Sequence, residues 1–248
     1  MVQVLCFIPC SARKQVTPQT VPVQRCVDQR DLPRFWAHLK RTRELLMERG
    51  ILQRAGPAAP AFWLYRGCFY GPLHESAELL LNLIKEGVLR LLVISGGYGL
   101  IDATEPIRLY NAVLSVNRQN NATPTARLWR EAGLHEMIAE VISTNKPKRV
   151  FGFFAGNVAW SKSNSKYRYF FTEGVRIARQ RGIHLEGGCF YRLKGRGPGA
   201  INKALGRTLI HIARQSFSMD VARHFLTGKM VGSIEIGFKP FHLKEWER

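Results

Sequence analysis

The feature that most constrains the fold is a regular alternation of short apolar segments with longer amphipathic ones. The apolar segments have the length of buried strands, and the amphipathic ones repeat apolar residues every three or four positions, as helices do. Chains of this kind form a mainly parallel or mixed sheet covered by helices on both faces. The expected strands are residues 2–9, 61–70, 89–94, 149–155, 188–193 and 233–238, and the expected helices are residues 32–50, 73–86, 125–144, 165–181, 196–215 and 219–227.

No segment clearly divides the chain into separate domains. The length of 248 residues suits one large domain, and 46% hydrophobic residues are enough to build its core. The most linker-like stretch, residues 54–60, is too short to separate two domains. We therefore predict a single α/β domain over residues 1–248, in which 188–228 is a DNA-binding segment for the reasons given below.

The charge of the chain points to a polyanionic partner. There are 37 lysines and arginines against 18 aspartates and glutamates, a net charge of +19 at pH 7. A surface of this kind binds a polyanion with release of its counterions, and duplex DNA is the commonest polyanion in a cell. DNA is therefore the expected partner, and the ribosome or a membrane surface is the less favoured alternative.

Several classes of protein are not expected. The apolar runs are too short to span a membrane, and residues 1–9 have the pattern of a first strand, without the basic region and cleavage site of a signal peptide. The five cysteines form no CxxC pair and are odd in number, which argues against disulfides and a zinc site. We expect a cytoplasmic monomer that uses no metal and no cofactor.

Three of the expected strands end in polar or glycine-rich residues. These ends are CSARK at residues 10–14, SGGYGLIDATEP at residues 95–106 and AGN at residues 155–157. Open α/β sheets bind ligands at the carboxyl ends of their strands. Each segment alone is more simply an ordinary turn, but the three together predict a shared cleft.

The segment SGGYGL is followed by two carboxylates. Its three glycines among five residues allow close approach of the backbone to a ligand, and its N–H groups could bind an anion or a carbonyl. The spacing matches neither a Walker A loop nor a dinucleotide fingerprint. Asp102 and Glu105 are candidate catalytic acids, and helix capping or a salt bridge to Arg108 is an equally weighted alternative.

The order of these motifs resembles the YaaA-type peroxide-stress proteins and their small phage and bacterial relatives. The collinear segments are IPCSARK, LYRGCFYGPL, SGGYGLIDATEPIRLY, LWREAGLHEMI, AGN before YRYF, and FYRLKGRGPGAINKALGRTLI, which together cover most of residues 3–215. The resemblance implies a DNA-binding α/β fold. It also implies that the acid at Glu105 matters more than Asp102, where the peroxide-stress proteins have no acid. The family residues matched here are Ser95, Gly96, Tyr98, Gly99 and Tyr110.

The late segment LKGRGPGAINKALG, residues 193–206, approximates the turn of a helix-hairpin-helix. Such a turn directs backbone N–H groups at a DNA phosphate without reading sequence. The alternative is a glycine-rich turn from a strand to a helix. Some helix-hairpin-helix glycosylases carry an aspartate about twenty residues further on, near Asp220, although a helix-capping role is favoured for this residue. The expected DNA-binding residues here are Lys194, Arg196, Gly197, Gly199, Lys203 and Arg207.

Basic and aromatic residues also interleave between Asn157 and Phe171. Lys162, Lys166 and Arg168 could follow a DNA strand, and Trp160, Tyr167 or Tyr169 could stack on an exposed base. The alternative is a helix whose aromatic residues face the core, which is favoured for Phe170 and Phe171. Cys10 is a weaker candidate nucleophile, since no histidine partner is evident from the spacing.

The favoured function is a DNA glycosylase that hydrolyses the N-glycosidic bond of a flipped base. This reaction needs a cationic cleft, an aromatic pocket, a carboxylate and donors to the leaving base. Glu105 is the predicted carboxylate, with Asp102 as its substitute and Asn157 as a donor. A modified base, as in DNA repair or in defence against phages with altered DNA, is a narrower version. The expected base pocket consists of Ser11, Lys14, Tyr65, Tyr70, Ser95, Gly96, Gly97, Tyr98 and Tyr110.

The alternative function is a stress-protection protein that binds DNA without chemistry. The basic charge and the late turn would be sufficient for it, and SGGYGL would then be structural. The two functions differ in whether Glu105, Tyr98 and Asn157 converge on one pocket wide enough for a base.

Overall fold

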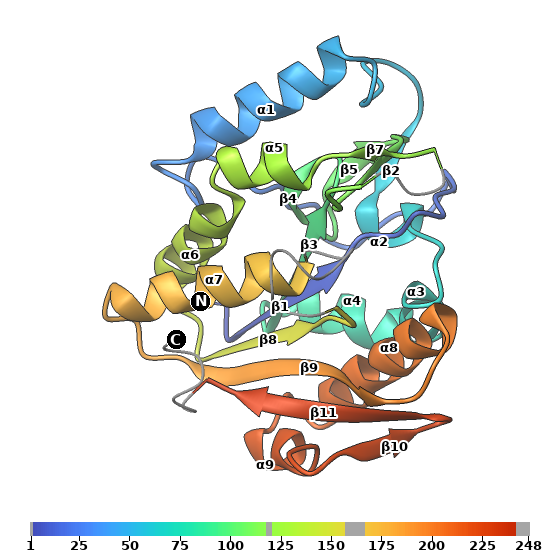
Figure 1. Ribbon diagram of the computed structural model, residues 1–248, viewed down its shortest axis with the longest axis vertical. Helices are drawn as coiled ribbons and strands as arrows, with labels where there is room; N and C mark the ends of the chain where they lie inside the picture. The colour runs from blue at the N-terminus through green and yellow to red at the C-terminus, as the bar shows by residue number, and fades with distance from the viewer. Residues whose placement is uncertain (1, 118–120, 157–166, 242–248) are drawn as a thin grey trace.

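A computed structural model describes residues 2–117, 121–156 and 167–241, and its centre is a seven-stranded sheet (Figure 1). The strand order is β10-β11-β9-β8-β1-β3-β4. The bounds are β1 (Val4–Pro9), β3 (Leu89–Ser95), β4 (Gly99–Asp102), β8 (Arg149–Phe153), β9 (Glu186–Lys194), β10 (Lys229–Val231) and β11 (Ile234–Pro240).

The middle of the sheet is parallel and both of its edges are antiparallel. β1 pairs in parallel with β3 on one side and with β8 on the other, and β8 pairs in parallel with β9. β4 and β11 pair antiparallel with β3 and β9, and β10 pairs antiparallel with β11. The predicted mixed, mainly parallel sheet is therefore confirmed.

Helices cover both faces of the sheet (Figure 1). On one face α6 (Leu134–Asn145) packs against α7 (Tyr167–Gln180), and α5 (Ala126–Glu131) packs against α6. On the other face α8 (Pro198–Arg214) packs against α3 (Tyr70–Glu75) and α4 (Ala77–Lys85). The remaining elements are α1 (Trp36–Glu48), α2 (Ala61–Leu64), α9 (Met219–Arg223) and two small sheets, β2 (Ala58–Pro60) with β5 (Pro106–Arg108) and β6 (Ala112–Val113) with β7 (Thr123–Pro124).

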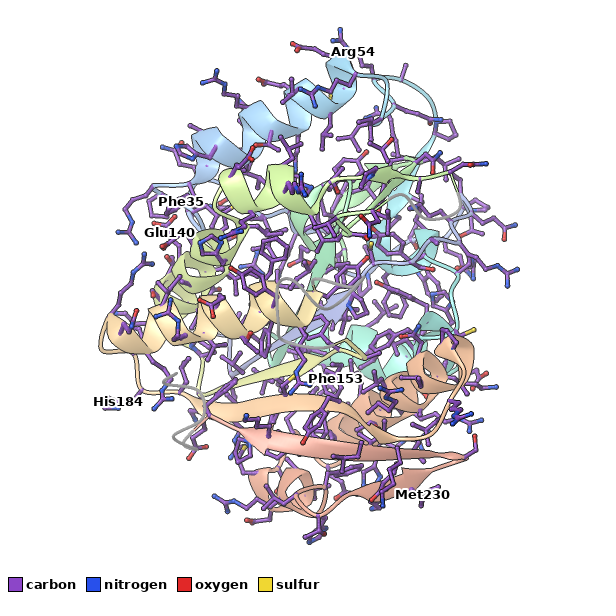
Figure 2. All side chains as sticks on the ribbon, viewed as in Figure 1. Phe35, Arg54, Glu140, Phe153, His184 and Met230 are labelled. Carbon is purple, nitrogen blue, oxygen red and sulfur yellow. The ribbon has the colours of Figure 1, made fainter. Side chains whose placement is uncertain are left out.

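The core between these layers is rich in phenylalanine. The ring of Phe153, in the middle of the sheet, stacks on Phe190 of the neighbouring strand with centroids 4.9 Å apart (Figure 2). Phe7 of β1 contacts Phe171 of α7 at 5.4 Å. Every residue of β1 and β3 is buried, which explains why both strands are nearly uniform apolar runs.

A buried carboxylate fixes the position of α1. Glu140 of α6 accepts hydrogen bonds from the backbone N–H groups of Arg34 and Phe35 and from Arg34 Nε, the last at 2.7 Å. Figure 2 shows Glu140 next to Phe35 where α6 meets the start of α1. The charge therefore satisfies donors at the beginning of a helix that has no side-chain cap of its own.

The structure differs from the sequence prediction in several elements, of which three lie near the site. Residues 61–70 do not form a strand: Ala61–Leu64 is the short helix α2, because a short buried apolar run does not distinguish the two structures by its period. The expected helix 125–144 is interrupted at Gly133, whose φ of 79° is left-handed. The residues after SGGYG return as the antiparallel strand β4, which the sequence did not predict.

The late segment 188–228 is part of the same sheet and of its helical cover. The turn at Gly195 and Gly197, with φ of +103° and +90°, joins β9 to α8. The element before the turn is thus a strand, and the predicted helix-hairpin-helix is not confirmed. Within the described residues, no helix has both the length and the apolar character needed to cross a bilayer.

Candidate functional site

The carboxyl ends of three parallel strands meet at one edge of the sheet. β3 and β8 flank β1, so the residues after Pro9, Ser95 and Phe153 share this edge, as predicted from the sequence. The chain passes from β1 to β3 on one side and later enters β8 on the other. Such a reversal of strand order leaves a crevice in open α/β sheets. Asn157, expected here as a donor, lies outside the described residues.

A sulfur and a phenol meet across this reversal point. Cys10, the residue after β1, has its Sγ 3.1 Å from the hydroxyl of Tyr167, the first residue of α7. Next to them, the hydroxyl of Tyr70 donates to the carbonyl of Pro9 at 2.9 Å. These contacts connect the end of β1 with helices from both faces of the sheet.

Three hydroxyls form a buried network beside Cys10. The hydroxyl of Tyr110 lies 2.9 Å from that of Tyr65 and 3.0 Å from Ser95 Oγ, and Tyr65 donates to the same oxygen at 3.4 Å. Burial raises the pKa of Tyr65 and of Tyr110 well above the ordinary value. Both phenols therefore stay protonated and remain hydrogen-bond donors. Tyr65 and Tyr70 are fully buried, which leaves Tyr110 to line the site.

Lys14 extends over this network. Its backbone forms a bridge with Tyr65, supported by the hydrogen bond from Gln15 N–H to the Leu64 carbonyl. The Lys14 Nζ lies 3.9 Å from the centroid of the Tyr110 ring and 3.4 Å from the Ala12 carbonyl. Burial lowers the pKa of Lys14, and the nearby Cys10 partly offsets this effect. The amine is thus held in a fixed place with a reduced tendency to be charged.

A cavity of about 360 Å³ opens beside Lys14. Its lining combines the amine, the ring of Tyr110 and the two carboxamide side chains of Gln53 and Asn111. Asn111 Nδ2 donates to the Asn121 carbonyl at 3.3 Å. A cationic group, an aromatic face and amides are the groups that bind a planar polar ring such as a nucleobase.

The SGGYGL loop is buried behind Tyr110 and does not face the cavity. The N–H groups of Gly97 and Tyr98 donate to Ser95 Oγ at 3.2 and 3.1 Å, so they are occupied within the protein. A Cβ on Gly97 would lie 2.4 Å from the Tyr110 ring. Gly96 is enclosed in the same way by the backbone of Val113 and Leu114. The glycines therefore allow the loop to pack against Tyr110.

Glu105 is buried in an ion pair on the far side of Tyr98. Its Oε1 accepts from Arg43 Nη1 at 3.0 Å, and its Oε2 accepts from the N–H groups of Val27 and Asp102 at 3.1 and 3.3 Å. Burial raises the pKa of Glu105, and Arg43 partly offsets this effect. Arg43 also donates to the Tyr98 carbonyl at 3.0 Å. The Glu105 carboxylate does not line the cavity. It is connected to Tyr110 through Arg43 and Tyr98, and the rings of Tyr98 and Tyr110 have centroids 5.4 Å apart.

Asp102 belongs to a second buried ion pair. Its Oδ2 accepts from Arg90 Nε at 2.9 Å, and Arg90 also donates to both oxygens of Asp31. Asp102 Oδ1 accepts from the hydroxyl of Thr104 at 2.9 Å. Asp220, the other acid considered, is exposed and pairs with Arg223 at 3.0 Å.

Basic residues lie around the turn between β9 and α8. Arg196, Lys203 and Arg207 are exposed, and none of them has an acidic partner within ion-pair distance among the described residues. Lys203 and Arg207 are one helical turn apart on α8 and share one side of it. Lys194 contacts Glu235 at 3.5 Å. Because β9 is parallel to β8, this turn lies at the same edge of the sheet as Cys10 and Lys14.

Two close contacts connect the basic turn with the cavity. A Cβ on Gly199, in the first turn of α8, would lie 3.3 Å from Cys68 Sγ. A Cβ on Gly67 would lie 2.3 Å from the hydroxyl of Ser11, which is next to the cavity residue Ala12. Of the residues predicted for the base pocket, Lys14 and Tyr110 line this cavity and the others do not. The two contacts place the CSARK loop near the start of α8.

Of the other residues predicted to bind DNA, Arg168 does not line the cavity, and two lie outside the described residues. Arg168 stacks on the Tyr191 ring at 4.2 Å and donates to the Gly156 carbonyl at 3.5 Å. Lys162 and Lys166 lie outside the described residues. Among the described histidines, cysteines and acids, no three gather as a metal site requires.

Sequence reasoning missed several residues of the site. Gln53 and Asn111 line the cavity and Arg43 holds Glu105, but none of them stands in a motif. For Asn111, its position directly after Tyr110 was the one feature of the sequence that could have indicated a place in the site. Comparison of the chain with models of known protein families and with curated proteins finds no match.

Proposed function

We propose that this protein is a cytoplasmic DNA glycosylase, working as a monomer, that binds a flipped base in the cavity beside Lys14. The observation that supports the proposal is that this cavity and the basic turn at Arg196 lie at the same edge of the sheet, with contacts between the CSARK loop, residues 67–68 and the start of α8. A phosphate held at the turn would place the adjoining nucleotide over the CSARK loop. The base would then reach Tyr110 and the carboxamides.

The lining of the cavity supports a base as its ligand. Tyr110 lines the cavity beneath the Lys14 amine, and Gln53 and Asn111 offer both donors and acceptors for the edge of a base. The hydroxyls of Tyr65 and Ser95 hold the Tyr110 hydroxyl in place, so this wall of the cavity is rigid. Rigidity reduces the ordering cost of binding a base.

One observation favours the binding-only alternative. Glu105 and Asp102, the acids expected to stabilise the sugar cation, both have arginine partners and are nearly fully buried. A stress-protection protein needs no carboxylate in its cavity. DNA affinity is expected for both functions, so only base release distinguishes the glycosylase from the binding-only protein.

Base release tests the proposal directly. Duplexes with assorted normal and modified bases would be incubated with the protein, and alkali or an abasic-site nuclease would reveal strand breaks. We expect breaks with at least one duplex, and their loss in Tyr110→Ala. If the wild-type protein releases no base from any duplex, the binding-only function replaces the glycosylase.

DNA binding itself should be strongly dependent on salt. Each phosphate neutralised by a lysine or arginine contributes about 0.9 to the slope of log K against log salt, so Arg196→Ala with Lys203→Ala should lower the slope by about 1.8. Binding should weaken equally on all sequences. The matched control is Lys40→Ala with Arg41→Ala, which removes the same charge from α1. A salt-independent affinity, or equal effects of both pairs, would contradict this interface.

A further inference from the structure

We propose that the Lys14 amine is the nucleophile that displaces the base and forms a Schiff base with the opened sugar. This inference rests on the proposed function and assigns the chemistry of the same site. The sequence analysis predicted Lys14 only as a residue that lines the base pocket, without a role in the chemistry. Lys14 is catalytic in this scheme because it touches the reacting carbon.

The position of Lys14 fits attack on the sugar. Lys14 lines the cavity together with Ala12, and Ser11 of the same loop contacts Gly67, next to the residue that contacts the start of α8. A nucleotide with its base in the cavity and its phosphate at the turn has its sugar between them. In the proposed complex the Lys14 amine, which lines the cavity, would attack the C1′ carbon of this sugar.

The surroundings of Lys14 favour a reactive amine. No acidic side chain of the described residues forms an ion pair with it, and its Nζ rests on the Tyr110 ring. Burial lowers the pKa of Lys14, so a larger share of the amine is neutral than for an exposed lysine. A neutral amine is the nucleophilic form, and desolvation beside apolar groups is one way to produce it.

The step balances without an added reagent. The nitrogen lone pair of Lys14 forms a bond to C1′, and the bond from C1′ to the base breaks with its electron pair on the base. The proton lost by the amine is gained by the departing base. The bond from C1′ to the ring oxygen then opens as the second amine proton moves to that oxygen, which leaves an imine. Water hydrolyses the imine to an aldehyde and returns the amine.

Borohydride trapping tests the proposal, because borohydride reduces an imine to a stable amine. Two labelled duplexes would be used, one with a base that the protein releases and one with a preformed abasic site. The wild-type protein should form a covalent adduct with both. Lys14→Arg keeps the charge over Tyr110 but cannot form the imine. It should keep its DNA affinity and lose adduct and base release by roughly 10³-fold or more.

A control variant distinguishes the outcomes. Lys40→Arg, at an exposed lysine of α1 away from the proposed interface, should form the adduct as the wild type does. Adduct that persists in Lys14→Arg, or base release by the wild type with no adduct, would overturn Lys14 while the glycosylase stands. Adduct on the abasic duplex through Lys14, without base release from any duplex, would support the amine and overturn the glycosylase.

Discussion

At the scale of single residues, burial determines what each polar group near the site can do. Glu105 and Asp102 are almost inaccessible and have arginine partners, whereas Lys14 has an aromatic ring beneath it and a cavity beside it. A buried ion pair gives little net stability, but the loss of one partner leaves a charge without compensation. The acids therefore contribute to the fold, and Lys14 is the basic side chain that lines the cavity.

Glu105→Gln should destabilise the protein more than it impairs the chemistry. The amide removes the charge that compensates buried Arg43, at a cost of about 3 kcal/mol. Chemical denaturation measures this loss, and the double variant Glu105→Leu with Arg43→Met should recover most of it. Base release by the folded variant should stay within about tenfold of the wild type. A folded Glu105→Gln that loses about 100-fold in base release would restore the carboxylate to the chemistry, as the sequence predicts.

At the scale of elements, the turn between β3 and β4 is a support for Tyr110. Its N–H groups are directed at Ser95 Oγ, which in turn bonds to the Tyr110 hydroxyl. The carbonyl of Gly96 accepts from Trp129 Nε1 and from the Thr125 hydroxyl, both at 2.7 Å. The turn is therefore held from two sides, and a change in it should pass to the ring that lines the cavity.

Gly97→Ala tests this support. The new methyl group would lie 2.4 to 2.8 Å from three atoms of the Tyr110 ring, so the ring or the loop must shift. We expect a loss of stability of about 1–3 kcal/mol, as for other overpacked sites, together with a loss of base release. Thermal unfolding and the strand-break assay measure the two effects.

The matched control for this variant is Gly71→Ala in α3. A Cβ at Gly71 meets no atom within 4 Å, so alanine should leave function unchanged and add up to about 1 kcal/mol of stability. Equal behaviour of the two variants would show that the contact with Tyr110 has no effect.

At the scale of the whole molecule, half-buried histidines should make stability depend on pH. His74 Nε2 donates to the Phe62 carbonyl at 2.8 Å, and its Nδ1 accepts from Arg66 at 3.3 Å, so the ring is neutral. Burial lowers the pKa of His74 and of His135. Both groups take up a proton more readily in the unfolded chain than in the folded one.

The free energy of unfolding should therefore fall as the pH decreases. The contribution of a group with a lowered pKa is complete above its unfolded pKa, about 6.5 for histidine, and is lost as the pH falls through the folded pKa. Urea denaturation at pH 7.5, 6.5 and 5.5 measures this loss. His74→Gln, which keeps a donor for the Phe62 carbonyl, should flatten the dependence, and an unchanged slope would contradict the neutral role of His74.

The sequence by itself determined the α/β class of the fold, the shared edge at which three polar strand ends meet and the net charge of the chain. These properties are local, because strand length, helical period and the residues that follow a strand are written in consecutive positions. The edge formed by Cys10 and Ser95 followed from the rule that parallel strands end on the same side. The DNA partner and the glycosylase activity remain predictions.

The tertiary structure alone decided which side chains are free to act. Glu105 meets an arginine 62 positions away, and Tyr110 meets Tyr65 across 45 positions. No pattern in the sequence records such pairs, because they arise when helices from separate parts of the chain pack on one sheet. The same packing buried Glu105, which the sequence favoured, and left Lys14 beside a cavity. Which side chains form hydrogen bonds or ion pairs depends on how far apart they lie in space. For residues that are far apart in the sequence, only the folded chain sets that distance.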